Sequence, residues 1–166
     1  MPAPPIAASL YEVVLAIHIM AVVVAFGVTF AYPIMFAVGA KADPRSLPVL
    51  HRIEYSIERR LINPGLLVVI AAGVYLASKL HQWSAFYVQW GLAVAIVIGA
   101  LVGAVMIPTA KRAEQVSAAD LAAAGAGAQQ PSEEYRQLVR RLTLVGSLLS
   151  LLVLATIYFM ATHTGA

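Results

Sequence analysis

Four long apolar blocks are the feature of this sequence that most limits what it can fold into. They lie at about residues 10–38, 61–80, 86–107 and 142–162. Each block has about the 20 apolar residues that a helix needs to cross the hydrocarbon core of a bilayer. A backbone in lipid must pair its own amide groups, and these blocks are continuous rather than alternating in polarity, so they favour helices over a closed barrel. The sequence therefore predicts an all-α protein, an integral membrane four-helix bundle.

The composition agrees with a protein that has lipid as its main surroundings. Hydrophobic residues make up 61% of the chain and charged residues only 11%, whereas about a quarter of a soluble domain is charged. The absence of cysteine excludes disulfides and thiolate metal sites. The net charge of +3 is not gathered into a nucleic-acid patch. We expect one transmembrane domain over residues 1–166, with the bilayer as partner and no nucleic acid.

Proline and polar signals set the expected ends and bends of the helices. The expected helices cover about residues 10–38, 48–80, 86–107 and 133–162. Pro33 is expected to kink the first helix near its inner end, the Asn-Pro-Gly run at 63–65 to bend the second, and Pro108 to end the third. Residues 111–131 are rich in alanine and glycine, which predicts a flexible cytoplasmic linker that is helical in its first half. Ser132 is the expected N-cap of the fourth helix.

The distribution of basic residues predicts the orientation in the membrane. Ten of the eleven lysines and arginines lie in segments 41–60 and 111–141, and only Lys79 lies in the connection between the second and third blocks. The positive-inside rule makes the basic side cytoplasmic. We therefore expect both termini outside the cytoplasm, in a multi-pass protein of a bacterial plasma (inner) membrane.

His18 is the strongest candidate for a functional residue. It lies about eight residues, or ~12 Å, below the start of the first helix, among apolar neighbours. An ionisable side chain at such a depth is a functional-site hypothesis by default. Neutral imidazole is the usual axial ligand of haem iron and a common ligand of zinc and copper. The equally weighted alternative is a histidine that forms a hydrogen bond to a neighbouring helix and holds the bundle together.

A second group of candidates lies at the outer ends of the helices. Glu12, His81 and His163 are expected at a similar level, with Met160 one turn below His163. A mixture of histidine and methionine suits copper, and a mixture of histidine and glutamate suits zinc. These residues are hypothetical metal ligands; the alternative is that they are solvated interfacial groups. His51 lies in a basic amphipathic stretch that is typical of a membrane-surface helix, where we expect it to be solvated.

Two further patterns have a simple and a sharper interpretation. Arg59 and Arg60 can anchor the second helix to anionic headgroups, or they can pair with the propionates of a haem. Small residues recur every fourth position along the third helix, which allows close helix packing within the chain, a dimer face, or a wall against a flat cofactor. They are Gly91, Ala95, Gly99 and Gly103.

Two stretches carry a resemblance to known families. LAIHIMAVVVAFG at 15–27 and IERRLINPGLLVVIAAGVYLA at 57–77 resemble an uncharacterised bacterial family of four-helix integral membrane proteins. More distantly, they are similar to the haem-containing J-type protoporphyrinogen oxidases and to the copper-resistance D membrane proteins, which share a histidine in the first helix. The resemblance to the J-type oxidases implies that His18 binds haem. It also implies a charged motif before a proline, matched here by Glu58, Arg59, Arg60 and Pro64.

The resemblance to the J-type oxidases is not complete. That family has a functional lysine at the start of its third helix, where this chain has Val88, Gln89, Trp90 and Gly91. Protoporphyrinogen oxidation is therefore not expected. We expect instead a redox or electron-transfer role with b-type haem at His18, with a membrane redox partner or with a second copy that shares the haem. The alternatives are a non-enzymatic scaffold or accessory subunit, and the handling of copper or another metal at the outer face.

Overall fold

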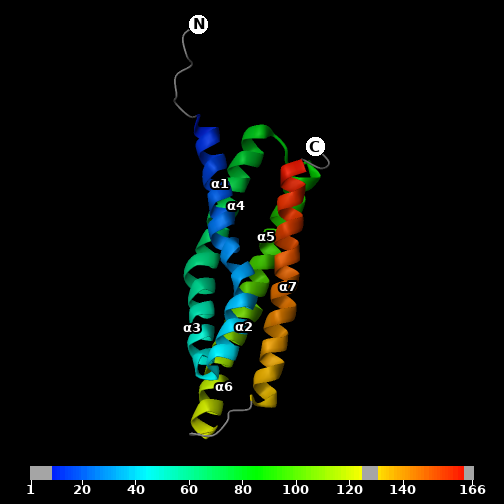
Figure 1. Cartoon of the computed structure of the whole chain (residues 1–166). Coiled ribbons are helices and arrows are strands. Elements are labelled where there is room, and N and C mark those ends of the chain that lie inside the picture. The colour runs from blue at the N-terminus through cyan, green and yellow to red at the C-terminus, as the bar shows by residue number, and fades with distance from the viewer. Residues whose placement is uncertain (1–8, 125–130, 163–166) are drawn as a thin grey trace.

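The computed structural model describes residues 9–124 and 131–162, and these residues form helices and no strand. The structure has four long helical rods, which run side by side (Figure 1). The rods are Leu10–Ala42, Pro44–Leu80, Phe86–Ala124 and Glu133–Thr162, and each is long and apolar enough to cross a membrane. The all-α membrane-bundle prediction is confirmed.

In chain order the elements are α1 (Leu10–Gly27), η1 (Val28–Ala31), α2 (Tyr32–Ala42), η2 (Pro44–Ser46), α3 (Leu47–Ile57), η3 (Glu58–Ile62), α4 (Asn63–Leu80), α5 (Phe86–Leu101), η4 (Val102–Met106), α6 (Ile107–Ala124) and α7 (Glu133–Thr162).

Irregular turns precede three of the prolines and let the rods continue past them. The 3₁₀ turn η1 comes before Pro33, and the π-helical turns η3 and η4 come before Pro64 and Pro108. Proline lacks an amide hydrogen and its ring crowds the carbonyl four residues earlier, so a locally tightened or widened turn relieves the conflict. Pro33, where a kink was expected, and Pro64, where a bend was expected, each follow one of these turns. The third helix, however, does not end at Pro108, because after η4 it continues as α6 to Ala124.

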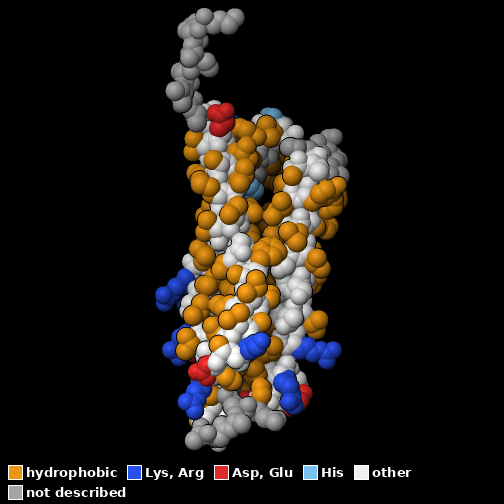
Figure 2. Space-filling view, viewed as in Figure 1, with side chains coloured by type: hydrophobic (Ala, Val, Ile, Leu, Met, Phe, Trp, Pro, Cys, Tyr) orange, Lys and Arg blue, Asp and Glu red, His pale blue; other side chains and the backbone are white. Residues whose placement is uncertain are grey.

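The two ends of the bundle differ in charge. We call the end at which α1 begins and α7 ends the upper end, as Figure 1 shows it, and the opposite end the basic end. In Figure 2, Lys and Arg side chains gather toward the basic end, while hydrophobic side chains are spread over the whole visible face. In the most apolar 18-residue stretch of each rod only 6% to 28% is buried. Such a wide exposed apolar surface requires lipid around it.

The basic end is held together by contacts between α3, α6 and α7. The helix α3 packs extensively against α6. It is therefore part of the bundle, and the expectation that it lies on the membrane surface was wrong. Ala110 and Ala113 of α6 are both 0% exposed there. An amphipathic pattern predicts that a helix has an apolar face. It does not show whether that face packs against lipid or against another helix.

Small residues set the closest helix approaches near the middle of the bundle. A Cβ atom added to Gly65 of α4 would lie 2.6 Å from the Cβ of Ala25 in α1. On α5, a Cβ at Gly99 would lie 3.1 Å from Leu66 of α4. At least this part of the small-residue stripe on α5 therefore serves packing within the chain, as the simpler interpretation predicts.

The upper half is built from pairs of helices rather than from a closed ring. There α1 packs along α4, α5 packs along α7, and α4 contacts α5. In contrast, α1 and α7 make at most marginal contact, and α7 meets the first rod mainly at η1. This arrangement leaves a space at the upper end between the two pairs.

Candidate functional site: a cavity at the upper end

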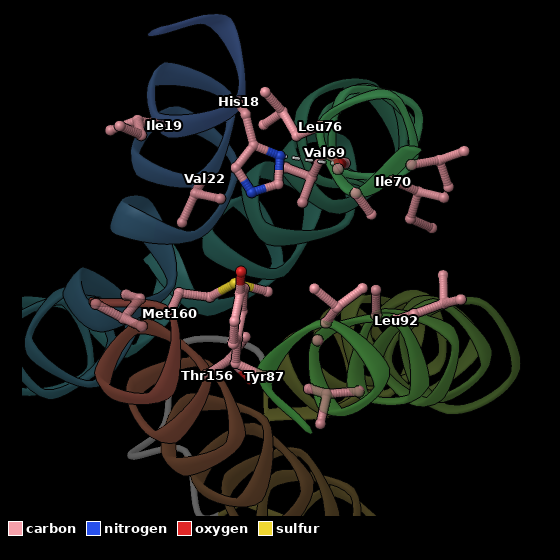
Figure 3. Close-up of a pocket in the computed structure, with 18 of the residues that line it drawn as sticks. His18, Ile19, Val22, Val69, Ile70, Leu76, Tyr87, Leu92, Thr156 and Met160 are labelled. Atoms are coloured by element: carbon pink, nitrogen blue, oxygen red, sulfur yellow. Dashed lines mark hydrogen bonds between the residues drawn. The ribbon is translucent and has the colours of Figure 1, made fainter. Parts of the chain in front are cut away.

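A cavity of about 530 Å³ lies between α1, α4, α5 and α7. This volume falls in the range of roughly 300–1,000 Å³ that is typical of small-molecule and cofactor sites. Most of its wall is aliphatic, with side chains such as Val22, Val69 and Leu92 drawn in Figure 3. Because α1 and α7 hardly touch, the cavity opens sideways between them, and Figure 2 shows a hollow in this face of the molecule. A ligand could therefore reach the cavity from the bilayer.

The imidazole of His18 is held in a defined orientation at the wall of this cavity. Its Nδ1 lies 3.0 Å from the backbone oxygen of Val69 in α4. A carbonyl oxygen only accepts, so Nδ1 carries the proton and the neutral ring has its lone pair on Nε2. Figure 3 shows this second nitrogen directed into the cavity. The bond ties α1 to α4, as the structural alternative predicts, and it is also the outer hydrogen bond that commonly orients a metal-binding histidine.

Gly73 makes the position of this ring possible. A Cβ atom at Gly73 would lie 3.3 Å from Cε1 of His18. Val69 and Gly73 are four residues apart and share one face of α4. Because Gly73 has no side chain, the ring can approach α4 closely enough to donate to the carbonyl oxygen of Val69. One lone pair of that oxygen accepts the helical hydrogen bond, and the second accepts from His18.

Met160 of α7 reaches the same cavity from the opposite side. Both Met160 and Thr156, one turn earlier, line the cavity, and Figure 3 shows the thioether of Met160 directed toward the space in front of His18. Gly91 of α5 lies against the methyl group of Met160, and a Cβ atom at Gly91 would overlap it. Below this point Trp90 donates to the hydroxyl of Thr156 across 3.1 Å, which joins α5 to α7.

The upper end of the cavity is more polar than its lower end. Tyr11, Gln82 and Trp83 line this upper end, and the hydroxyl of Tyr87 donates to the side-chain oxygen of Gln82. Deeper in the bundle the wall consists of buried aliphatic side chains such as Leu66 and Val94. The cavity therefore suits an amphipathic ligand with its polar edge toward the upper end.

The structure does not bring the other upper-end candidates into a metal site. Glu12 forms a capping box with Ser9, whose amide lies 2.7 Å from a carboxylate oxygen of Glu12. His81 is an exposed residue with a left-handed backbone, φ 52°, at the end of α4. His163 lies outside the described residues. Within the described ranges, no group of three or more His, Asp and Glu residues could hold a metal ion. A contribution of His163 to such a site stays a prediction.

Arg59 and Arg60 are exposed and do not line the cavity beside His18. They belong to η3, and the guanidinium of Arg59 donates to the hydroxyl of Tyr55 across 2.9 Å. Arg60 lines a shallow groove on the surface of the second rod. Their position disfavours contact with propionates in this cavity and leaves headgroup anchoring as the prediction for both.

A buried polar cluster at the basic end was not predicted. His51 was expected to be solvated, but it is 1% exposed. Its Nδ1 lies 3.0 Å from a carboxylate oxygen of Glu54, and its Nε2 lies 3.0 Å from the hydroxyl of Tyr135 in α7. Nearby in the fold, Glu58 Oε2 and the hydroxyl of Tyr32 are buried and have no hydrogen-bond partner among the described residues.

The spacing of this cluster was the signal that could have revealed it. Leu47, His51, Glu54 and Glu58 follow one another at intervals of four, three and four residues, which places them on one face of a helix. Because Leu47 is a core residue of that face, the polar residues that share it are buried too. The charged appearance of the surrounding segment concealed this pattern.

Comparison with known proteins identifies the family of the chain. Residues 12–164 match the model of a family described as "Predicted integral membrane protein (DUF2269)". This match covers most of the chain, and the chain therefore belongs to that family. No curated protein matches the sequence, and no solved structure matches the fold.

Proposed function

We propose that this integral membrane protein binds a b-type haem in the upper cavity, with His18 as an axial ligand, and has a redox or electron-transfer role. One observation carries the proposal. The Nδ1 of His18 is bound to Val69 at 3.0 Å while Nε2 faces an apolar cavity. A histidine that served only to join two helices would not require a cavity of about 530 Å³ in front of its second nitrogen.

The residues around His18 fit such a ligand chemically. The imidazole supplies a neutral nitrogen donor, and its bond to a backbone carbonyl increases the basicity of that donor. Aliphatic walls would exclude water from a flat apolar ring, and the polar upper end at Tyr11, Gln82 and Trp83 would solvate carboxylates at the edge of that ring. When bound, haem would supply a one-electron iron couple. The protein would fix the orientation of the ring and limit its contact with water.

The proposal is tested by the absorption spectrum of the purified protein after expression with haem supplied. We expect a Soret band in the wild type and loss of most of the haem in His18→Ala. Addition of imidazole to His18→Ala should restore part of the band, because a free ligand can enter the space left by the side chain. His81→Ala is the matched control, since His81 is exposed and its replacement should leave the haem content unchanged.

Two results would contradict the proposal. A folded wild-type protein without a Soret band would exclude haem and favour the non-enzymatic scaffold or accessory subunit. Normal haem content in His18→Ala would exclude His18 as the ligand. Metal analysis of the same preparations separates a third outcome, in which copper or zinc is present without porphyrin.

A further inference from the structure

The thioether of Met160 is a second metal-binding group that the fold directs into the cavity of His18. Among the described residues that line this cavity, His18 is the only histidine and Met160 the only methionine. The two belong to different rods, α1 and α7, that lie on either side of the lateral opening. Figure 3 shows both side chains directed toward the space between them.

Both residues also lie at a comparable depth in the bundle. His18 is in the third turn of α1, and Met160 is in the last turn of α7. Figure 1 shows that α1 begins beyond the level at which α7 ends, so the greater depth of His18 along its own helix is compensated. Two axial ligands of one iron must lie on opposite faces of a flat ring at the same level. This condition disfavours His81, which ends α4 at its exposed upper end.

The methyl end of Met160 packs against α5. Its methyl group occupies the space that a side chain at Gly91 would need, and Gly91 is itself buried in α5. The bond between Trp90 and Thr156 holds α5 and α7 together one turn below. These contacts place Met160 beside α5 at the wall of the cavity.

We infer that Met160 Sδ is the second axial ligand, opposite His18 Nε2; the inference rests on the proposed haem site. Ligation by histidine and methionine is a known haem arrangement, and methionine raises the reduction potential relative to a second histidine. Both donors would come from one chain, so a second copy would not be needed to complete the site. The protein would then be an electron carrier of comparatively high potential.

Spectroscopy of the loaded protein tests this ligand without an activity assay. The oxidised wild type should be low-spin and show the weak far-red charge-transfer band of a sulfur–iron bond. Met160→Ala should keep its haem through His18, lose that band, become largely high-spin and bind carbon monoxide more readily when reduced. Met160→His should remain low-spin and show a lower midpoint potential. Met20→Ala is the matched control, because Met20 is 57% exposed on α1.

Gly91→Ala gives a second variant that leaves the thioether in the chain but displaces it. We expect it to weaken the far-red band and raise the high-spin fraction, since the added Cβ overlaps the Met160 methyl group. A wild type that binds haem through His18 but has no far-red band, or a Met160→Ala spectrum identical to wild type, would overturn this inference and leave the proposed function standing. A wild type without haem would instead remove both.

Discussion

The contact between Gly65 and Ala25 predicts that Gly65→Ala destabilises the bundle. A Cβ atom at Gly65 would lie 2.6 Å from the Cβ of Ala25 and 3.6 Å from its Cα. Ordinary carbon contacts lie near 3.5–4.0 Å, so α1 and α4 would have to separate by roughly 1 Å. Alanine has no rotamer with which to avoid the overlap, and Ala25 is 1% exposed in the core. The strain must therefore be taken up by the backbones.

The expected magnitude follows from two opposing effects. Overpacking of a core costs about 1–3 kcal/mol, and the absence of a rotamer escape places this site near the upper value. Replacement of glycine by alanine within a helix returns about 0.5–1 kcal/mol. The free energy of unfolding should therefore fall by about 2 kcal/mol.

Denaturant unfolding of the protein in detergent micelles, followed by circular dichroism, measures this effect. Gly103→Ala is the matched control, because nothing lies within 4 Å of a Cβ at Gly103, and it should be neutral or stabilising by up to about 1 kcal/mol. Ala25→Gly added to Gly65→Ala should remove the overlap and recover much of the loss, which appears as a coupling energy between the two sites. If Gly65→Ala is as stable as Gly103→Ala, or if the two changes are additive, the steric argument is refuted.

Two further predictions concern the basic end, and the same unfolding assay checks both. Tyr135→Phe removes the partner of His51 Nε2 at 3.0 Å and should lower the free energy of unfolding by about 1–3 kcal/mol, since it leaves a buried donor or acceptor unpaired. The control is Tyr55→Phe, because the hydroxyl of Tyr55 bonds only an exposed arginine in the described structure. Its effect should be smaller, and equal effects would contradict the argument. Ser132→Ala removes the hydroxyl that accepts from the amide of Tyr135 at the start of α7. It should lower the free energy of unfolding by about 0.5–2 kcal/mol. Its control, Ser56→Ala, loses only a hydrogen bond to its own helix and should be nearly neutral.

The parts of the fold that the sequence predicted are those determined by local chemistry. Continuous apolar blocks have few alternatives to a helix in lipid, so the four rods were predictable. The N-cap at Ser132 was predictable for the same reason, because its hydroxyl serves an amide only three residues away. The irregular turns before Pro33 and Pro64 likewise follow from the chemistry of proline.

The errors arose where local signals compete with the rest of the fold. Pro108 was expected to end a helix, but a π-helical turn accommodates it and the third rod continues along α3. His51 was expected in water because its neighbours in the sequence are basic. Its actual surroundings include Tyr135, which is 84 residues away in the sequence, and no local pattern contains that contact.

The candidate site has the same limit. The depth of His18 was evident from the sequence, and so were the presence of a methionine near the end of the fourth helix and the small residues on the third. Their convergence was not evident, because it depends on which helices pack against which. No local pattern indicates that Gly73 makes room for His18, or that Gly91 makes room for Met160.

The packing of the described helices explains why the cavity of His18 lies at the upper end. At the basic end α3, α6 and α7 meet around the hydrogen-bonded cluster of His51, and alanines of α6 allow close contact. Toward the upper end, α1 packs closely against α4 at Gly65, and a hydrogen bond between Trp90 and Thr156 joins α5 to α7. The helices within each pair pack closely, but little direct contact between α1 and α7 sets the distance between the two pairs. That distance therefore depends on what occupies the space between them. An apolar ligand with a place for a nitrogen and a sulfur donor would complete that packing, which is the physical reason to look for function at this end.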